Sequence, residues 1–170
     1  MKSKKMTVGL LIFYLIALVW IILFKLQFST ADLPHIRNIN LVPFAESVIV
    51  NGKLDVSEII KNGVAFIPYG VFVHILWEQK SFVTQCVPIF ATSLLLEVLQ
   101  FVFAIGASDI TDIIMNSLGG MVGILIAVCL QKIVKVKWIR IINVFSFIGA
   151  AAMTLLIAIL LAANIVGVKK

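Results

Sequence analysis

The chain has 170 residues, of which 62% are hydrophobic and 13% charged, and its mean hydropathy is +1.15. The chain has too few polar side chains to cover the surface of a water-soluble globule, so the composition predicts an integral membrane protein in contact with the lipid bilayer. The net charge of +6 does not indicate nucleic-acid binding, because the basic residues lie mainly at the ends of apolar runs and in loops, where they orient membrane helices.

The apolar runs are long and lack the alternation in polarity of transmembrane β-strands. The expected fold class is therefore all-α, a polytopic transmembrane helical bundle of about five spans that forms a single domain over residues 1–170. The first run covers residues 6–24 and follows three lysines. A cleaved signal peptide is the alternative there, but the run exceeds the usual signal core of about 7 to 15 residues. A retained helix is favoured.

A polar segment separates the first and second spans. It contains HIRNINLVPF and then NGKLD, in which Asn51-Gly52 predicts a turn. Asp55 and Glu58 have the spacing of a capping box, so the second span is expected over residues 56–77.

Three further apolar runs predict spans at residues 82–105, 113–130 and 141–166. Alternate connections must share one side of the membrane. The N-terminus, WEQKS and the loop at 131–140 therefore lie together, and this side has the densest basic clusters. The positive-inside rule predicts that this side, with the N-terminus, is cytoplasmic. The loops that contain HIRNINLVPF and SDITD are expected on the outer side.

The cysteines and histidines show no spacing typical of metal ligands. Cys86 and Cys129 lie inside apolar runs and are predicted to be small core residues. His35 and His74 are predicted to be structural. No metal site is therefore expected.

A glutamate lies deep in the third predicted span. Glu97 precedes the expected outer end at Ile105 by eight residues, or about 12 Å along a helix. A charge near the centre of a span costs about 2.5 to 3.5 kcal/mol on insertion scales, so Glu97 needs a polar partner. Ser93 and Gln100 share its helical stripe, which is expected to face protein or water.

The fourth span carries a second polar stripe. Asp112, Asn116, Gly119 and Gly123 fall on one face, and the two glycines have the GxxxG spacing that permits close helix approach. A short loop joins this span to the third, so the two stripes are expected to meet. We therefore expect an outward-open polar pocket lined by Arg37, Asn62, Glu97, Gln100, Asp109, Asp112 and Asn116.

Several of these residues also have a purely structural interpretation. Glu97 can hold helix register through a hydrogen bond, although an intramembrane carboxyl group is a functional-site candidate by default. Asp109 and Asp112 precede the expected helix start, where they interact favourably with the helix dipole, and Asp112 can cap the helix. Asn116 and Gly119 fit a packing role.

Four motifs occur in an order and spacing typical of a known family. They are RNINLVPF at 37–44, NGVAFIPYG at 62–70, EVLQ at 97–100 and DITDIIMNSLGG at 109–120. In these motifs the chain resembles the VanZ-like family. By position, the family's motif residues match Arg37, Asn40, Pro43, Asn62, Pro68, Gly70, Glu97, Gln100, Asp109, Asp112, Asn116 and Gly119. The chain departs from the family at Gly106, where members often carry Arg, and at Thr111, where they often carry an acid.

The resemblance implies a multi-pass protein of the bacterial cytoplasmic membrane, in a family whose founding member confers low-level teicoplanin resistance. It implies no cofactor and no established reaction, and the cofactor and any protein partner are left unknown. The expected ligand is a membrane lipid or a cell-wall precursor, whose polar headgroup enters the pocket while its acyl or prenyl chain lies against apolar helices. Its expected binding residues are Arg37, Asn62, Gln100 and Asn116.

Whether the protein is an enzyme is left open. An enzyme would use Glu97 as general acid or base, with Asp109 and Asp112 orienting a substrate or holding Mg²⁺. A non-catalytic accessory protein and a small ion-coupled transporter are the alternatives. The transporter is less favoured because the sequence shows no internal repeat.

Overall fold

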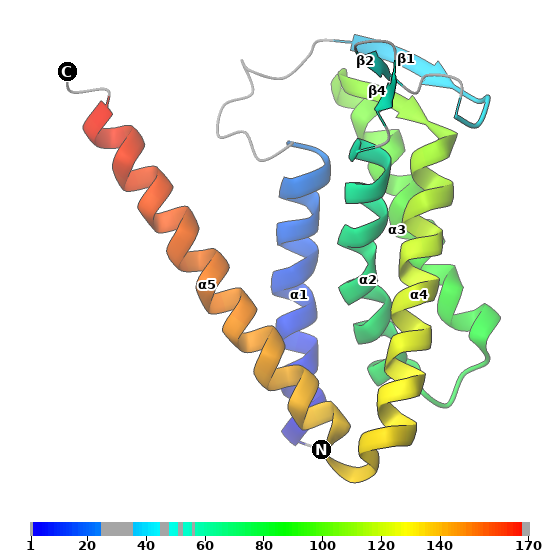
Figure 1. The fold of residues 1–170 in the computed structure, drawn as a ribbon, viewed down its shortest axis with the longest axis vertical. Coiled ribbons are helices and arrows are strands. Elements are labelled where there is room, and N and C mark those ends of the chain that lie inside the picture. Colours follow the sequence, from blue (N-terminus) through cyan, green and yellow to red (C-terminus); the bar gives the residue numbers. More distant parts are fainter. Residues whose placement is uncertain (1, 25–35, 45–47, 51–52, 56, 168–170) are drawn as a thin grey trace.

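The computed structural model describes residues 2–24, 36–44, 48–50, 53–55 and 57–167. Within these ranges the fold is an all-α membrane bundle, as predicted (Figure 1). Its long helices are α1 (Lys2–Ile22), α2 (Ser57–Trp77), α3 (Phe82–Phe103), α4 (Ile110–Val134) and α5 (Trp138–Gly167).

The described residues contain four helical stretches that are long and apolar enough to cross a membrane. The last of them, Ile110–Ile159, comprises α4 and most of α5. A short 3-10 turn, η2 (Lys135–Lys137), connects these two helices, and the chain reverses direction there (Figure 1). The predicted count of about five spans therefore compares with four stretches, the last of which contains two helices.

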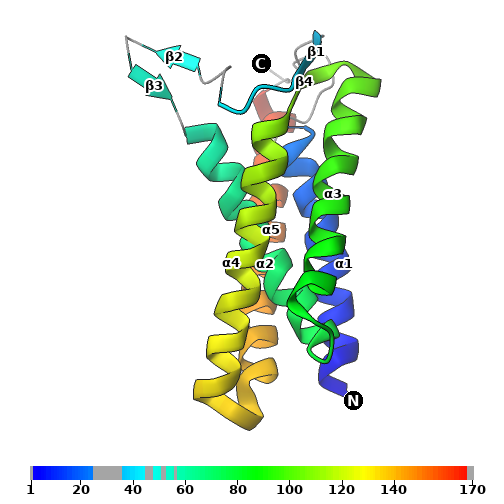
Figure 2. The same cartoon turned by 90° about the vertical axis from the view of Figure 1, so that its right-hand side faces the viewer.

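Short strands lie at one end of the bundle, where only loops were expected. β1 (Ile36–Asn40) pairs in parallel with β4 (Ile105–Asp109), and β2 (Val48–Val50) pairs antiparallel with β3 (Lys53–Asp55). Figure 2 shows both pairs at the same end of the bundle, and we call this the strand end. Three predictions fall outside the described residues and side chains: the turn at Asn51-Gly52, the capping contact of Glu58 and the structural role of His35.

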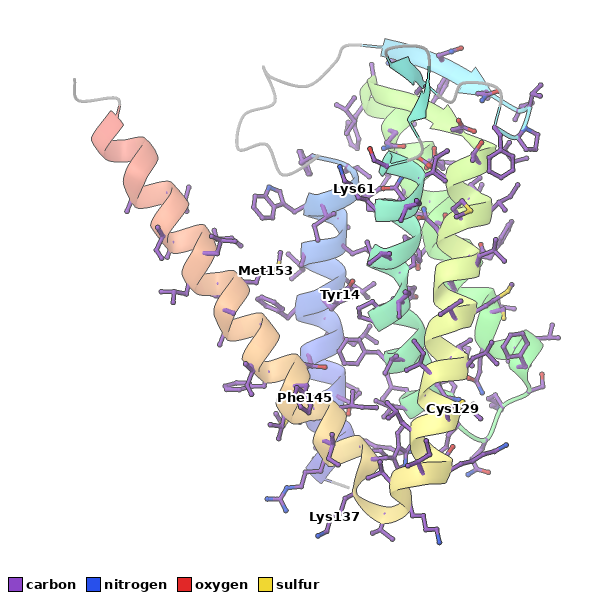
Figure 3. The ribbon with its side chains drawn as sticks, in the orientation of Figure 1. Tyr14, Lys61, Cys129, Lys137, Phe145 and Met153 are labelled. Carbon is purple, nitrogen blue, oxygen red and sulfur yellow. The ribbon has the colours of Figure 1, made fainter. Side chains whose placement is uncertain are left out.

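The opposite end of the bundle is basic, and we call it the basic end. It holds the start of α1, the connection between α2 and α3, and the turn between α4 and α5 (Figures 1 and 3). Its basic residues include Lys4, Lys5, Lys80, Lys132, Lys135, Lys137 and Arg140. The Lys4 Nζ atom lies 2.8 Å from Glu78 Oε1, so an ion pair joins α1 to the connection between α2 and α3.

The main apolar core lies between the first four helices. Each of them contributes a side chain that is at most 1% exposed: Leu18 from α1, Phe66 from α2, Ile89 from α3 and Ile124 from α4. The Tyr14 hydroxyl also donates a hydrogen bond to the Ala65 carbonyl, which links α1 to α2. The first apolar run of the sequence therefore forms part of this core.

Glycines bring α2 and α4 into backbone contact, and these helices form the most extensive helix pair in the described chain. A Cβ atom added to Gly119 would overlap with the carbonyl oxygen of Gly63, and one added to Gly123 would overlap with that of Ile67. The close helix approach predicted from the GxxxG spacing is therefore confirmed. The structure identifies α2 as the partner.

The two cysteines lie in different environments. Cys86 is half-buried and packs against the main core, but Cys129 is exposed on α4. The prediction of a core position is therefore wrong for Cys129. Ala127, two residues earlier, is fully buried, and residues two apart on a helix point about 200° apart, so Cys129 points away from the bundle.

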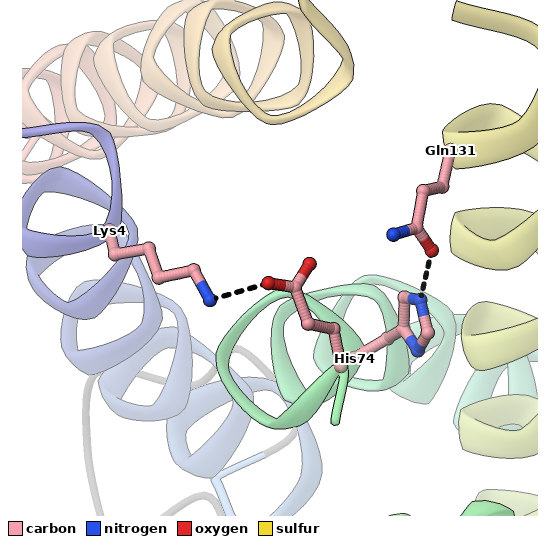
Figure 4. A network of polar contacts seen from close by, with 4 residues as sticks. Lys4, His74 and Gln131 are labelled. Carbon is pink, nitrogen blue, oxygen red and sulfur yellow. Dashed lines mark hydrogen bonds and ion pairs between the residues drawn. The ribbon is translucent and has the colours of Figure 1, made fainter. Parts of the chain in front are cut away.

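A buried histidine links three helices near the basic end, and Figure 4 shows its contact with Gln131. His74 of α2 is 5% exposed, and its Nδ1 lies 2.9 Å from Gln85 Oε1 of α3. Its Nε2 lies 3.2 Å from Gln131 Oε1 of α4. Because Gln85 Nε2 donates to the Lys80 carbonyl oxygen, the Gln85 Oε1 atom must face the ring, so Nδ1 carries a hydrogen.

We expect His74→Leu to lower the free energy of unfolding by about 2 kcal/mol, because the buried amide of Gln85 and the half-buried amide of Gln131 would lose their partner. Thermal unfolding of the purified protein in detergent measures the change. Gln131→Leu removes one of the two contacts and serves as the comparison, with a smaller expected loss. Wild-type stability in His74→Leu would show that the network does not hold the helices together.

Candidate functional site

A cavity of about 530 Å³ lies at the strand end between α3, α4 and the β1–β4 pair. We call it the strand-end groove. Its polar lining residues are Asn40, Glu97, Ser108 and Asp109, and its other described lining residues are apolar. The α3 wall includes Phe90, Leu94 and Val98, each more than 40% exposed. The groove is therefore open along the exposed apolar face of α3.

Glu97 lies at the boundary between the helices and the strands. Its side chain is 3% exposed, and its Oε2 accepts a hydrogen bond of 2.9 Å from the backbone N–H of Asp109. The Ser108 hydroxyl donates to the Glu97 backbone carbonyl at 2.7 Å. The buried carboxyl group therefore has a polar partner, and it connects α3 to the last residue of β4.

Asp109 ends β4 and caps α4. Its Oδ1 accepts a 2.7 Å hydrogen bond from the Thr111 backbone N–H, which is N-cap geometry. The expectation that α4 starts at residue 113, with Asp112 as a possible cap, is wrong. The pairing of β4 with β1 keeps the chain extended through Asp109, so the helix begins at Ile110 and places Asp112 in its first turn.

The segment after β1 is tied to the start of α4. Asn40 is 7% exposed, and its Nδ2 donates to Asp109 Oδ2 at 3.1 Å. Its Oδ1 accepts from the Val42 backbone N–H at 3.0 Å. The hydroxyl of Thr111 accepts from the Phe44 backbone N–H at 2.9 Å. These contacts position the RNINLVPF segment over the groove.

The structure brings two of the seven predicted pocket residues, Glu97 and Asp109, into the groove lining. The other five lie elsewhere among the described residues. Arg37 is exposed and donates from Nη2 to the Val102 carbonyl at 3.1 Å, near the end of α3. Asn62 lies half-buried on α2, and Asp112 lies half-buried on α4.

Two further predicted residues are buried between helices. Gln100 Nε2 donates to the Ile22 carbonyl oxygen at 3.3 Å, at the end of α1. Asn116 is fully buried, and its Nδ2 donates to the Ser93 hydroxyl at 3.0 Å, between α4 and α3. The third and fourth spans therefore do meet through polar side chains. Part of this contact is internal to the bundle and does not line the groove.

Sequence reasoning did not place Asn40 and Ser108 in the pocket. Asn40 had a signal in the RNINLVPF motif, and its position opposite Asp109 follows from the parallel pairing of β1 with β4. Ser108 lies in β4, where the sequence predicted a loop. The positions of both residues could therefore be predicted only with knowledge of the strand pairing.

The polar lining of the groove is acidic, and Glu97 within it is buried. The lining has the carboxyl groups of Glu97 and Asp109, and no described lining residue is Lys, Arg or His. Within the described part of the chain, no three His, Cys, Asp or Glu side chains lie close enough together to hold a metal ion. The arrangement places two carboxyl groups beside apolar walls.

Residues 11–135 match the family model described as VanZ/LLP1. The chain belongs to this VanZ-like family. It is also 34% identical over 157 residues to Protein VanZ of Enterococcus faecium, an alignment that covers 91% of the chain and 92% of that protein. No solved structure matches it.

The family match extends the resemblance that four motifs indicated between residues 37 and 123. The VanZ-like range contains most of α1, all of α2 and α3, and every described residue that lines the groove. α5 lies beyond the matched range. The groove therefore belongs to the part of the chain that the VanZ-like family shares.

Proposed function

We propose that this VanZ-like membrane protein binds a cell-envelope lipid or a lipid-linked peptidoglycan precursor in the strand-end groove. The observation that carries the proposal is the combination of Glu97 and Asp109 with apolar walls that include exposed residues of α3. A volume of about 530 Å³ lies within the range of small-molecule sites, about 300 to 1,000 Å³.

The shape of the lining supports an amphiphilic ligand. Phe90, Leu94 and Val98 form an apolar wall along α3, and Glu97 and Asp109 lie near the strands at its polar end. An acyl or prenyl chain entering from the bilayer would lie along the wall and bring its headgroup to the carboxyl groups. A water-soluble ligand would not require an opening toward the bilayer.

The physiological part of the proposal is low-level resistance to teicoplanin. Its support is membership of the VanZ-like family and similarity to Protein VanZ of Enterococcus faecium. Binding of an envelope lipid or precursor would alter how much of it the antibiotic meets at the outer surface. Ligand binding in the groove and teicoplanin resistance are therefore two measurable consequences of the same proposed function.

We expect the wild-type chain to protect a sensitive Gram-positive host against teicoplanin more than against vancomycin. The protection should disappear in Glu97→Gln, because this substitution changes the groove's acidic lining while keeping a side chain of the same size. Minimal inhibitory concentrations are compared with an empty vector at matched membrane levels. No protection by well-expressed wild type would contradict the resistance role. Full protection by Glu97→Gln would favour an accessory role that does not use the groove.

The proposal places the strand end outside the cell and the N-terminus in the cytoplasm. Its support is the cluster of lysines and arginines at the basic end, since such clusters stay on the cytoplasmic side. The bacterial cytoplasmic membrane is the proposed location. In this orientation the groove is accessible to the outer leaflet.

Cysteine labelling tests this orientation. In a Cys86→Ser/Cys129→Ser background, Val42→Cys should react with a membrane-impermeant maleimide in intact cells, because Val42 is 62% exposed at the strand end. Val136→Cys, at a position 95% exposed in the turn after α4, should react only after permeabilisation. The reverse pattern would show that the basic end is outside.

A further inference from the structure

We propose, as a refinement that rests on the function proposed above, that the ligand group at the polar end of the groove is a primary ammonium and not a phosphate. The proposal concerns the headgroup alone. The apolar chain beside it can belong to any lipid that fits the walls. Three features of the groove support this choice.

The first feature is the charge of the lining. Glu97 and Asp109 contribute carboxyl groups, and no described lining residue is basic. The Arg37 guanidinium is directed to the Val102 carbonyl, and Lys61 lies on α2, which supplies no described lining residue (Figure 3). Protein sites for phosphate usually supply Arg or Lys, so a phosphate here would meet carboxyl groups without a counter-charge.

The second feature is the N-terminus of α4, which borders the groove through Ile110. A helix N-terminus can bind a phosphate through its unpaired backbone N–H groups. Here the Asp109 carboxylate already accepts from the Thr111 N–H at 2.7 Å and adds its own negative charge. The helix end is therefore capped from within the chain and is poorly suited to a second anion.

The third feature is the supply of acceptors. Each Asp109 carboxylate oxygen accepts one hydrogen bond, Oδ1 from Thr111 and Oδ2 from Asn40. A carboxylate offers about four acceptor sites, so Asp109 retains capacity for further donors. The Ser108 hydroxyl donates to the Glu97 carbonyl and keeps its lone pairs. A primary ammonium brings three N–H donors and the complementary charge.

Photo-crosslinking of the full chain in phosphatidylcholine nanodiscs tests the proposal. Three probes share one alkyl chain with a diazirine near its end and differ in headgroup: primary ammonium, hydroxyl or phosphate monoester. Mass spectrometry of the labelled peptides locates the chain. We expect the ammonium probe to label the groove walls of α3 and α4 about tenfold more than the phosphate probe, with the hydroxyl probe between them.

Two variants and a control identify the source of the preference. Glu97→Gln and Asp109→Asn should lower the ratio of ammonium labelling to hydroxyl labelling toward one. Each keeps an acceptor oxygen for its present backbone partner. Glu78→Gln removes a carboxylate at the basic end, far from the groove, and should keep the wild-type preference. Thermal unfolding of the same samples verifies that each variant is folded.

The outcomes separate this inference from the proposed function. If the groove walls are labelled equally by all three probes, or most strongly by the phosphate probe, the ammonium inference is overturned and lipid binding in the groove stands. If no probe labels the walls, the groove does not take an alkyl chain, and the proposed function and its refinement both fail. Labelling led by the ammonium probe and sensitive to both carboxyl variants supports both.

Discussion

Gly119→Ala should lower the free energy of unfolding by about 3 kcal/mol, at the upper end of ordinary overpacking costs. The added methyl group would overlap with the backbone carbonyl of Gly63, which cannot move without displacing α2. Gly70 faces the Gly120 carbonyl in the same way, so Gly70→Ala should have a similar effect. The two helices would have to separate along much of their contact.

Gly149→Ala is the matched control for this prediction. Gly149 also lies in a helix, but an added Cβ atom would meet nothing within 4 Å. Alanine is favoured over glycine in a helix by about 1 kcal/mol, so this variant should be as stable as wild type or slightly more stable. Thermal unfolding in one detergent compares the three variants. Equal stability of Gly119→Ala and Gly149→Ala would show that α2 and α4 do not approach as closely as described.

The second large effect is expected at Glu97, where two substitutions separate fold from function. Glu97→Leu should lower the free energy of unfolding by about 2 kcal/mol, because the Asp109 backbone N–H would lose its acceptor in a partly buried site. Glu97→Gln keeps an amide oxygen that can accept the same bond. Its stability should therefore stay close to that of wild type.

Stability and teicoplanin susceptibility are measured together for both variants. Glu97→Gln should be folded but without protective effect, whereas Glu97→Leu should lose stability and protection. Ser108→Ala, which removes the neighbouring hydroxyl bond to the Glu97 carbonyl, gives the cost of a single contact at this junction. If Glu97→Gln unfolds as easily as Glu97→Leu, its loss of protection would reflect misfolding and not the chemistry of the groove. If Glu97→Leu is as stable as wild type, the bond to Asp109 does not hold the strand end together.

The helices were predictable because the signal for a membrane helix is local. The run at 56–77 became α2 at Ser57–Trp77, and the run at 82–105 became α3 at Phe82–Phe103. A stretch of about 20 apolar residues must satisfy its backbone polar groups internally in lipid, whatever surrounds it. Helical periodicity also placed Glu97 correctly on a buried stripe. The family resemblance likewise depended on short motifs that can be read in order.

Tertiary structure alone decided the composition of the groove. Asn40 and Asp109 are 69 residues apart in sequence, and the parallel pairing of β1 with β4 brings them together. That pairing also starts α4 at Ile110 and makes Asp109 its cap. Periodicity shows which side chains share a face of one helix, but not which neighbour that face contacts. The neighbour depends on how closely the backbones approach and on strand register, which are properties of the assembled chain. For this reason Gln100 contacts the end of α1 and Arg37 contacts the end of α3. Only Glu97 and Asp109 of the predicted pocket residues line the groove.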